Sequence, residues 1–400
     1  MTATETRSLF DPTDLGPVRL RNRTVKCATN EGLSRDGLVT DALVEWHRRF
    51  ADGGVGMTTL AYCSVASEGR TFPNQVWMRE EARPGLERFA ASIHEGGAKA
   101  AIQLGHAGAF APPHATGRKP LAPSRQFSPY AETFSVAMTE DDLAVARRQF
   151  ADAATLAVDC GFDVLEIHLG HGYLLNQFLS PFNNKRGDAY GGSVENRARF
   201  PREVLADVRA AVGARAAVTA KLNMDDGFRG GLTVADSIRT AVLIESDGSV
   251  DALQLTGGHT TRTPFFLMRG GVPLSEMVAN EKGFLRKLGF RVFGALFMRE
   301  YPFEEAFFLE RARRFREATA LPLMLLGGVN RLDTMTAAVA EGFDFIAMGR
   351  ALIHTPDLVA RMERGEASAS GCIHCNLCVA EMEGPHGTRC IDPTAGQPLR

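Results

Sequence analysis

Short apolar runs recur along the chain and alternate with longer segments of mixed polarity. The longer segments predict amphipathic helices at residues 41–52, 84–96, 200–212, 234–246 and 303–318. The apolar runs predict eight buried strands, at residues 25–28, 55–61, 99–104, 162–167, 216–222, 252–256, 321–326 and 343–348. Eight strands that alternate with helices are typical of an α/β fold of the TIM (β/α)8 barrel type.

Two segments depart from this alternation. Residues 9–25 alternate apolar and polar side chains around Gly16 and Pro17, which predicts an N-terminal β-hairpin. Residues 260–301, rich in Phe, Met, Arg and Lys, interrupt the pattern before the seventh strand, and we expect them to lie near the barrel mouth as a lid. We therefore divide the chain into a barrel over residues 1–365, with this insertion at about 260–301, and a cysteine-rich extension over residues 366–400.

Composition narrows the class of protein. The 400 residues are 44% hydrophobic, which is enough to bury a large core. The 47 acidic and 45 basic side chains give a net charge of −2 without long blocks of one sign, so we expect no nucleic-acid partner. The first residues do not resemble a signal peptide and no apolar stretch is long enough to span a membrane, so we expect a soluble, cytoplasmic protein without a membrane partner. A homo-oligomer stays open.

The clearest candidate chemistry follows the fourth predicted strand. His168, His171 and Tyr173 come directly after the apolar run 162–167, and all three side chains can donate hydrogen bonds. In a barrel, the carboxyl end of a strand is where catalytic side chains are placed. A polar, glycine-rich passage at residues 183–196 is too long for a simple turn, and ordered loops of that length are usually functional.

This part of the chain resembles the Old Yellow Enzyme and NADH:flavin oxidoreductase family. The resemblance extends from Leu9 to Cys390, so it covers nearly the whole chain. It implies a TIM barrel that binds FMN and takes hydride from NADH or NADPH. The residues that carry it are His168-x-x-His171-Gly172-Tyr173, then Phe178–Pro181, then Tyr190–Ser193 with Glu195, Asn196 and Arg197.

A phosphate group could be held at the ends of the last two strands, where barrels commonly bind one. Gly327, Gly328 and Val329 follow the seventh strand, and Gly349 and Arg350 follow the eighth. Glycines let backbone N–H groups approach an anion, and an arginine can pair with it through two nitrogens. We predict that Gly328, Val329, Gly349 and Arg350 bind the FMN phosphate.

The resemblance also implies contacts with the flavin ring. It places Thr29 and Asn30 near the flavin N5, Ala61 beneath the ring, Gln103 at the pyrimidine edge and Lys221 beside N1 and O2. Many relatives carry arginine where this chain has Lys221. Because lysine is a point charge and arginine a planar fork, we expect a different flavin potential.

For the substrate, the resemblance implies that His168 and His171 hold the oxygen of a carbonyl or a similar acceptor. Two donors on one oxygen stabilise a developing enolate. The two rings can converge if the strand end turns into helical geometry, in which neighbouring side chains share one face. Tyr173, whose ordinary pKa near 10 keeps it protonated at neutral pH, is then the expected proton donor.

Three further residues bear on the substrate. His259 lies in a His-x-x-Arg-x-Pro string that resembles the dienoyl-CoA reductase branch, so it is a second candidate acid, although an ordinary loop histidine stays an alternative. Tyr62 is expected to face the pocket and contact the substrate. Ala109 replaces the arginine of the family string His-Ala-Gly-Arg, which indicates a different substrate geometry.

Four cysteines near the C-terminus have the spacing of a thiolate metal site. Cys372, Cys375 and Cys378 are separated by two residues each, and Cys390 follows after eleven. The string resembles the cluster motif of the trimethylamine dehydrogenase and dienoyl-CoA reductase branch, in which a 4Fe–4S cluster relays electrons to a C-terminal domain. Since this chain ends ten residues after Cys390, a cluster would have no partner within it, and iron–sulfur, zinc and bare thiols all stay open.

These observations predict an FMN-dependent oxidoreductase of the ene-reductase type, which transfers hydride from NAD(P)H through flavin N5 to an electron-poor C=C bond of a small-molecule substrate. The alternative is an amine dehydrogenase or demethylase resembling trimethylamine dehydrogenase, passing electrons through a 4Fe–4S cluster to an external acceptor. Its tryptophan-rich site is hard to build from Trp46 and Trp77 alone. A flavin-binding electron carrier without catalysis would leave the histidine pair unexplained.

Overall fold

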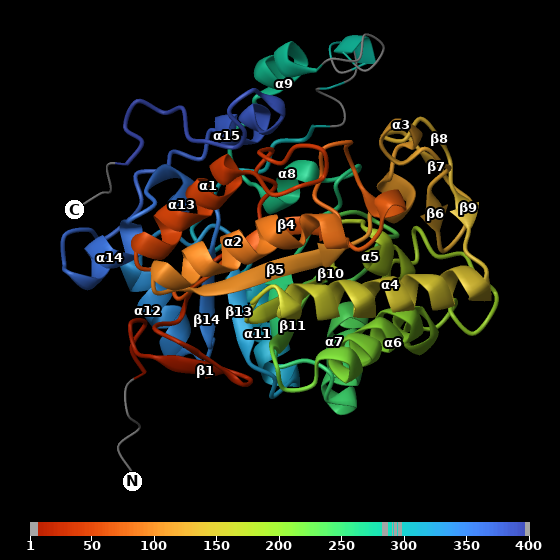
Figure 1. Ribbon diagram of the computed structural model, residues 1–400, viewed down its shortest axis with the longest axis horizontal. Helices are drawn as coiled ribbons and strands as arrows, with labels where there is room; N and C mark the ends of the chain where they lie inside the picture. The colour runs from red at the N-terminus through yellow and green to blue at the C-terminus, as the bar shows by residue number, and fades with distance from the viewer. Residues whose placement is uncertain (1–6, 282–286, 290, 292–293, 295–297, 397–400) are drawn as a thin grey trace.

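The fold is a closed barrel of eight parallel strands, with helices around its outside (Figure 1). The computed structural model describes residues 7–281, 287–289, 291, 294 and 298–396. The barrel strands follow one another around the ring in chain order, and the last pairs with the first. The predicted TIM barrel is therefore confirmed.

All eight predicted strands are present, with ends shifted by a few residues. Almost every residue in them is buried, because side chains fill the barrel on one face and helices cover the other. The strands are β3 (Thr24–Lys26), β4 (Met57–Ser64), β5 (Lys99–Gly105), β10 (Val164–Leu169), β11 (Ala217–Asn223), β12 (Ala252–Thr256), β13 (Leu323–Leu326) and β14 (Phe345–Met348).

The outer helices agree with the amphipathic pattern, apart from their starts and two omissions. The helix expected from residue 200 begins at Val194, because the Ser193 side chain caps it by accepting from the Asn196 N–H. The helix expected from residue 303 begins only at Leu309. The helices at residues 140–159 and 332–340 were not predicted from the sequence. The helices are α1 (Asp41–Asp52), α2 (Arg83–Glu95), α4 (Glu140–Asp159), α6 (Val194–Val212), α7 (Val234–Asp247), α11 (Leu309–Ala318) and α12 (Leu332–Ala340).

The remaining elements are short and lie in loops. They are α3 (Pro113–Thr116), α5 (Leu174–Leu179), α8 (Pro264–Leu267), α9 (Leu274–Asn280), α13 (Arg350–His354), α14 (Leu358–Glu363) and α15 (Leu377–Ala380), with β6 (Leu121–Ala122), β7 (Phe127–Ser128), β8 (Thr133–Phe134) and β9 (Val136–Ala137). None of the helices in the described residues has the length and apolar character needed to cross a membrane.

The N-terminal hairpin is formed as predicted, by β1 (Thr13–Leu15) and β2 (Val18–Leu20). Leu15 and Leu20 are fully buried and belong to a small core that includes inward-facing strand residues such as Val25 and Met57. The hairpin therefore covers one end of the barrel, and the other end holds the loops that follow the strands (Figure 1).

The insertion and the C-terminal extension meet at that second end, where α9 and α15 lie together (Figure 1). Asn280 donates a hydrogen bond to the Ala380 carbonyl at 2.7 Å, and His374 stacks on Phe303. Residues 282–286, 290, 292–293 and 295–297 of the predicted lid lie outside the described residues. That the insertion works as a lid stays a prediction, as does the division into two domains.

The extension also fastens the loop that follows the first barrel strand. The Thr388 N–H donates to the Glu31 carbonyl at 2.8 Å, and the Thr388 hydroxyl donates to the Asn30 carbonyl at 2.6 Å. The indole of Trp46, on α1, donates to the Thr388 carbonyl at 2.8 Å. Residues nearly 360 positions apart thus form one wall, which supports the side chains of residues 29–31.

Candidate active site

A cavity of about 2490 Å³ opens among the loops at the carboxyl ends of the barrel strands. Ligand pockets are usually about 300–1,000 Å³, so this cavity has room for a large cofactor and a second molecule. Every residue that the sequence predicted for cofactor, catalysis or substrate lines it: Thr29, Asn30, Ala61, Tyr62, Gln103, His168, His171, Tyr173, Lys221, His259, Gly328, Val329, Gly349 and Arg350.

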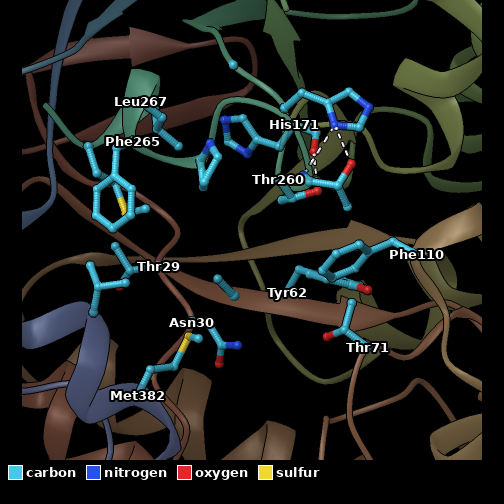
Figure 2. Close-up of a pocket in the computed structure, with 18 of the residues that line it drawn as sticks. Thr29, Asn30, Tyr62, Thr71, Phe110, His171, Thr260, Phe265, Leu267 and Met382 are labelled. Atoms are coloured by element: carbon cyan, nitrogen blue, oxygen red, sulfur yellow. Dashed lines mark hydrogen bonds between the residues drawn. The ribbon is translucent and has the colours of Figure 1, made fainter. Parts of the chain in front are cut away.

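The cavity has two facing walls (Figure 2). Thr29 and Asn30 lie on one side, with Met382 of the C-terminal extension beside Asn30. His171 and Thr260 lie across from them. Residues from distant parts of the chain therefore face one another around a shared space.

His168 and His171 converge, with ring centroids 5.0 Å apart and planes at 80°. The Gly170 N–H donates to Nδ1 of His168 at 3.3 Å, so in the neutral ring Nε2 carries the proton. Nε2 of His171 lies 2.8 Å from the Thr256 hydroxyl oxygen. Burial lowers the pKa of both rings, that of His171 to about 3, so both are neutral N–H donors at pH 7.

The backbone that brings the two histidine rings together is not helical. The expectation that helical geometry at the strand end makes them converge is therefore wrong. His171 has a φ of +61° and Gly172 one of +79°, which is left-handed geometry. The Asn223 side-chain oxygen accepts from the His171 N–H at 3.0 Å, and the His171 carbonyl accepts from the Thr260 N–H at 3.0 Å (Figure 2). These two bonds hold a turn that a non-glycine residue rarely adopts.

A buried carboxylate, that of Asp226, stabilises this turn through hydrogen bonds to the residues that hold it. Asp226 accepts from the Ser180 hydroxyl at 2.6 Å and from the Asn223 side-chain amide at 2.9 Å. Asn176 donates to the same carboxyl group at 3.4 Å, and its own oxygen accepts from the N–H of Gly172 at 2.7 Å. The sequence analysis missed these residues. The available signal was a pair of polar residues, Asn176 and Gln177, within an otherwise apolar stretch.

Tyr173 and Tyr62 complete the wall beside His168. The Tyr173 ring lies 4.9 Å from the His168 ring and 5.1 Å from the Tyr62 ring. Burial raises the pKa of Tyr173 above its usual value, so its hydroxyl stays protonated. The Tyr62 hydroxyl donates to the Gly69 carbonyl at 2.9 Å, which leaves the Tyr62 ring to shape the wall.

His259 is attached to the same turn. Its backbone bridges to that of His171, and a Cβ placed on Gly172 would lie 2.6 Å from its ring. The Thr261 N–H donates to Nδ1 of His259 at 3.3 Å, so the proton of the neutral ring is on Nε2. Nε2 is buried and has no hydrogen-bond partner among the described residues. Burial lowers the pKa of His259 to about 4, so the ring is uncharged at pH 7.

Lys221 reaches the cavity from β11 as half of a buried ion pair. Its Nζ lies 3.3 Å from the Glu166 carboxylate, and the Gln103 side chain donates to the same oxygen at 2.6 Å. The strand register explains this grouping, because β10 places His168 opposite Lys221 and Glu166 opposite Gln103. The ammonium retains donors for a ligand, and Gln103 retains its carbonyl oxygen. Sequence reasoning did not identify Glu166.

A second buried lysine, also missed, lies under Thr29. The Lys26 ammonium donates to the Cys27 carbonyl at 2.7 Å and to the Thr29 hydroxyl oxygen at 3.0 Å. Because an ammonium can only donate, the Thr29 hydroxyl must accept here, and its proton is free to point into the cavity. Burial lowers the pKa of Lys26. The signal in the sequence was a charged residue inside the apolar run at residues 25–28.

Two further ionisable groups adjoin Lys26. The Glu31 carboxyl group lies 3.1 Å from Nε2 of His47, whose Nδ1 lies 2.7 Å from the Thr58 hydroxyl oxygen. Burial raises the pKa of Glu31 to about 8 and lowers that of His47 far below its usual value. At neutral pH both groups are therefore mostly uncharged.

The residues predicted to cradle a phosphate form a close-packed turn. Gly328 has a φ of +73°, and a Cβ there would lie 2.6 Å from Phe307, so only glycine fits. A Cβ on Gly349 would lie 3.3 Å from the Cys27 sulfur. Arg350 opens α13, and one of its terminal nitrogens donates to the Arg269 carbonyl at 2.8 Å and to the Asn376 side chain. This cradle fits the phosphate of FMN, because two glycine turns and one fixed arginine face a shared space.

The residues and their positions agree with a family of known sequences. The model of the NADH:flavin oxidoreductase / NADH oxidase family matches residues 8–256. The chain belongs to this family. Relatives that match much of the chain include an NADH oxidase and an NADPH dehydrogenase, and the protein is an NAD(P)H-dependent flavin oxidoreductase with FMN as its cofactor.

Individual relatives differ in what they act on. A 4,4'-dithiodibutanoate disulfide reductase from Rhodococcus erythropolis is 46% identical over 98% of this chain and 96% of its own. A structure of 2-naphthoyl-CoA reductase has a TM-score of 0.82 and 25% identity, and the match covers 97% of this chain and 57% of that one. An Old Yellow Enzyme homologue from Zymomonas mobilis, at 22% identity, TM-score 0.73 and coverage of 98% and 100%, shows the same fold. This chain thus spans little more than half of the naphthoyl-CoA reductase.

The four C-terminal cysteines line a second, much smaller cavity next to Arg350. All four are free thiols, and burial raises the pKa of Cys378 to about 12 while the nearby Arg350 guanidinium opposes that shift. The donor set is suited to a soft metal or an iron–sulfur cluster. In the described part of the chain, no three His, Cys, Asp or Glu side chains are close enough to hold a metal ion, so the metal site stays a prediction.

Proposed function

We propose that the protein uses NAD(P)H to reduce an electron-poor C=C bond in a small organic acceptor, as an ene-reductase does. The observation that carries the proposal is the pair of converging neutral imidazoles, His168 and His171, with Tyr173 beside them in a cavity large enough for a cofactor and an acceptor. An electron carrier without catalysis has no need of this arrangement.

The cofactor would be held at both walls. Gly328, Val329, Gly349 and Arg350 bind its phosphate, and Thr29, Asn30, Ala61, Gln103 and Lys221 surround the ring. When bound, FMN supplies a carrier that takes two electrons from NAD(P)H and returns them to the acceptor. The Lys221 ammonium and the free proton of Thr29 supply hydrogen-bond donors beside it.

The substrate wall supplies polarisation and a proton. The N–H groups of His168 and His171 hold the carbonyl oxygen of the acceptor and stabilise the negative charge that grows there, an effect typically worth about 3–4 kcal/mol per donor. Tyr173 donates a proton to the α-carbon. A phenol whose pKa is raised can still protonate an enolate carbon, which is far more basic. His259, uncharged at pH 7, is the second candidate donor.

Disulfide reduction is a second candidate, favoured by the relative from Rhodococcus erythropolis that is 46% identical over 98% of this chain. In that reaction an S–S bond breaks, two electrons from NAD(P)H enter, and two protons complete two thiols. Thiols have a pKa of about 8.5, so a departing thiolate needs no strong acid beside it. The two candidates therefore differ in how much they require Tyr173.

Tyr173→Phe separates the two candidates. The test follows NADPH and NADH oxidation with 2-cyclohexenone and with 4,4'-dithiodibutanoate, under nitrogen. For an ene-reductase, the variant loses roughly a hundredfold or more in turnover of the alkene, the contribution typical of general acid catalysis. Disulfide turnover falls far less. If the wild type reduces neither acceptor while NADH still bleaches its flavin, both candidates are wrong.

The cysteine quartet could hold a 4Fe–4S cluster or zinc through Cys372, Cys375, Cys378 and Cys390. The support is that all four thiols line the same cavity. Iron, zinc and acid-labile sulfide measured on anaerobically purified protein test the proposal. About four irons and four sulfides per chain indicate the cluster, one zinc indicates a structural site, and neither leaves the thiols free.

A further inference from the structure

The residues that line the cavity carry a net positive charge, whereas the whole protein carries a slight negative one. Although the net charge of the protein is −2, six lysine or arginine side chains among the described residues line the cavity, against one acidic residue, Glu281. The basic side chains are Arg35, Lys221, Arg229, Arg262, Arg299 and Arg350. Lys221 is paired with Glu166, and Arg350 belongs to the phosphate cradle. The remaining arginines exceed what the FMN phosphate requires, so the cavity is suited to a second anion.

Arg262 is the best positioned of these arginines. Its guanidinium carbon lies 4.5 Å from the centre of the Phe182 ring and 5.6 Å from that of Phe228. The two rings meet edge to face at 5.1 Å and form a fixed platform. A guanidinium stacked on aromatic rings keeps its N–H edge free for a carboxylate. Arg262 forms no ion pair with any acidic residue in the described part of the chain.

A second donor adjoins this platform. The His259 ring lies 5.6 Å from Phe228 and 6.1 Å from Phe182. His259 lines the cavity, and its Nε2–H, which is buried, lacks a partner among the described residues. An unsatisfied buried donor is destabilising, and a ligand that accepts a hydrogen bond from it would offset that cost. His259 is also joined to the turn of His171, so the platform adjoins the catalytic wall.

We propose that Arg262 and the Nε2–H of His259 form a carboxylate-binding subsite, with Phe182 and Phe228 as its floor. The natural acceptor then carries a carboxylate a few carbons from the bond that is reduced. The proposal rests on the reductase function and deepens it by assigning the acceptor's charge. The disulfide in the name of the relative from Rhodococcus has this chemistry, with a carboxylate three methylene groups from each sulfur. The subsite serves an unsaturated acid equally well.

Ligand binding to the oxidised holoenzyme tests the subsite without turnover. The flavin absorbance is titrated with 4,4'-dithiodibutanoate and with its dimethyl ester, which has the same disulfide and chain but no charge. We expect the diacid to bind more tightly, and Arg262→Gln to raise its Kd about tenfold or more, the value of one charged hydrogen bond. Arg262→Lys keeps the charge but loses the planar stack, so an intermediate Kd is expected.

Two controls accompany the titration. Arg148→Gln removes an exposed arginine from α4, away from the cavity lining, and leaves the ratio of the two Kd values as in the wild type. Flavin content and the melting temperature of each variant show whether it folds. The ratio of kcat/KM for diacid over diester repeats the comparison during turnover, and it falls with Arg262→Gln.

The results separate the subsite from the reductase function. Equal affinity of the wild type for diacid and diester overturns the subsite, and so does a loss on Arg262→Gln that is the same for both ligands. In either case, turnover of both ligands would leave the reductase function standing. If NADH fails to reduce the flavin and neither ligand is turned over, the proposed reductase function is wrong. The subsite then has no role in catalysis.

Discussion

Two lysines are fully buried, Lys221 at the wall of the active-site cavity and Lys26 beneath Thr29, and their surroundings differ. Lys221, on β11, has the Glu166 carboxylate 3.3 Å from its ammonium. Lys26, on β3, has only neutral oxygens as acceptors among the described residues, those of Cys27 and Thr29, and lies 4.8 Å from the centre of the Trp46 ring. The Glu31 carboxyl group, which adjoins Lys26, is mostly protonated at neutral pH because burial raises its pKa to about 8.

The two lysines therefore have different uses. Lys221 and Glu166 nearly cancel, so the pair can position Gln103 and a ligand at little net charge. A protonated Lys26 has no carboxylate to compensate its charge, and its desolvation costs folding free energy. An uncompensated cation is destabilising for folding, but it favours any group nearby that gains negative charge, as a flavin does on reduction. We therefore expect removal of Lys221 to harm folding and removal of Lys26 to harm electron acceptance.

The largest expected effect comes from breaking the paired lysine. Lys221→Met leaves the Glu166 carboxylate buried without its partner, and such breaks cost about 3–5 kcal/mol of unfolding free energy. Glu166→Gln should cost a similar amount by leaving Lys221 alone. The double variant Lys221→Met/Glu166→Gln should recover much of the loss, since no unpaired charge remains. Urea unfolding of the FMN-free proteins measures all three.

A surface pair provides the control. Arg147 and Glu203 lie 3.3 Å apart but are about one-third and one-quarter exposed, so Glu203→Gln should cost less than about 1 kcal/mol. If Lys221→Met unfolds no more easily than Glu203→Gln, the buried pair is not the stabilising element that its geometry indicates.

The intermediate effect comes from the unpaired lysine. Lys26→Met should leave the unfolding free energy within about 1 kcal/mol of the wild type or raise it, because a desolvated charge is removed. The flavin midpoint potential should fall, since positive charge near the reduced flavin is lost. Anaerobic dye titration measures the potential.

Thr29→Val tests whether Lys26 acts through the hydroxyl that it orients. If it does, Lys26→Met and Thr29→Val lower the potential non-additively in a double-mutant cycle. A conservative exchange that keeps the hydroxyl, Thr29→Ser, should retain the wild-type potential. A rise in potential on Lys26→Met contradicts the account given for this lysine.

The two lysines also show what the sequence could and could not predict. The barrel, its hairpin and the residues that line the cavity followed from apolar runs, strand ends and motif strings, because these are local patterns. Lys221 was named because the family resemblance places it beside the flavin ring. Lys26 was overlooked because its meaning depends on Trp46, Glu31 and His47, which only the folded chain brings to it.

The same limit applies to the supports of the site. Asp226 holds the His171 turn through Asn223, and Thr388 holds the loop at Asn30 across most of the chain. Neither contact has a fixed spacing in the sequence. The left-handed backbone of His171 was likewise unforeseen, since a histidine gives no local sign of positive φ. Local patterns thus placed the groups that react, and long-range hydrogen bonds decide how those groups are held.

The smallest expected effect is a pH dependence that belongs to Lys26 and not to Lys221. The pKa of Glu31 is raised to about 8, so its carboxyl group is neutral below that pH and becomes a carboxylate as the pH rises through it. The new negative charge offsets Lys26, and electron acceptance nearby becomes less favourable. The rate constant for flavin reduction by NADH should therefore fall above pH 8 by less than tenfold, about 1.4 kcal/mol.

Glu31→Gln, which stays neutral, should remove the inflection, as measured by stopped-flow absorbance from pH 6.5 to about 9.5. If the inflection persists in Glu31→Gln but disappears in Lys26→Met, the titrating group is another neighbour of Lys26, and the comparison between the two lysines still holds. If it persists in both variants, the charge at Lys26 has no part in electron acceptance.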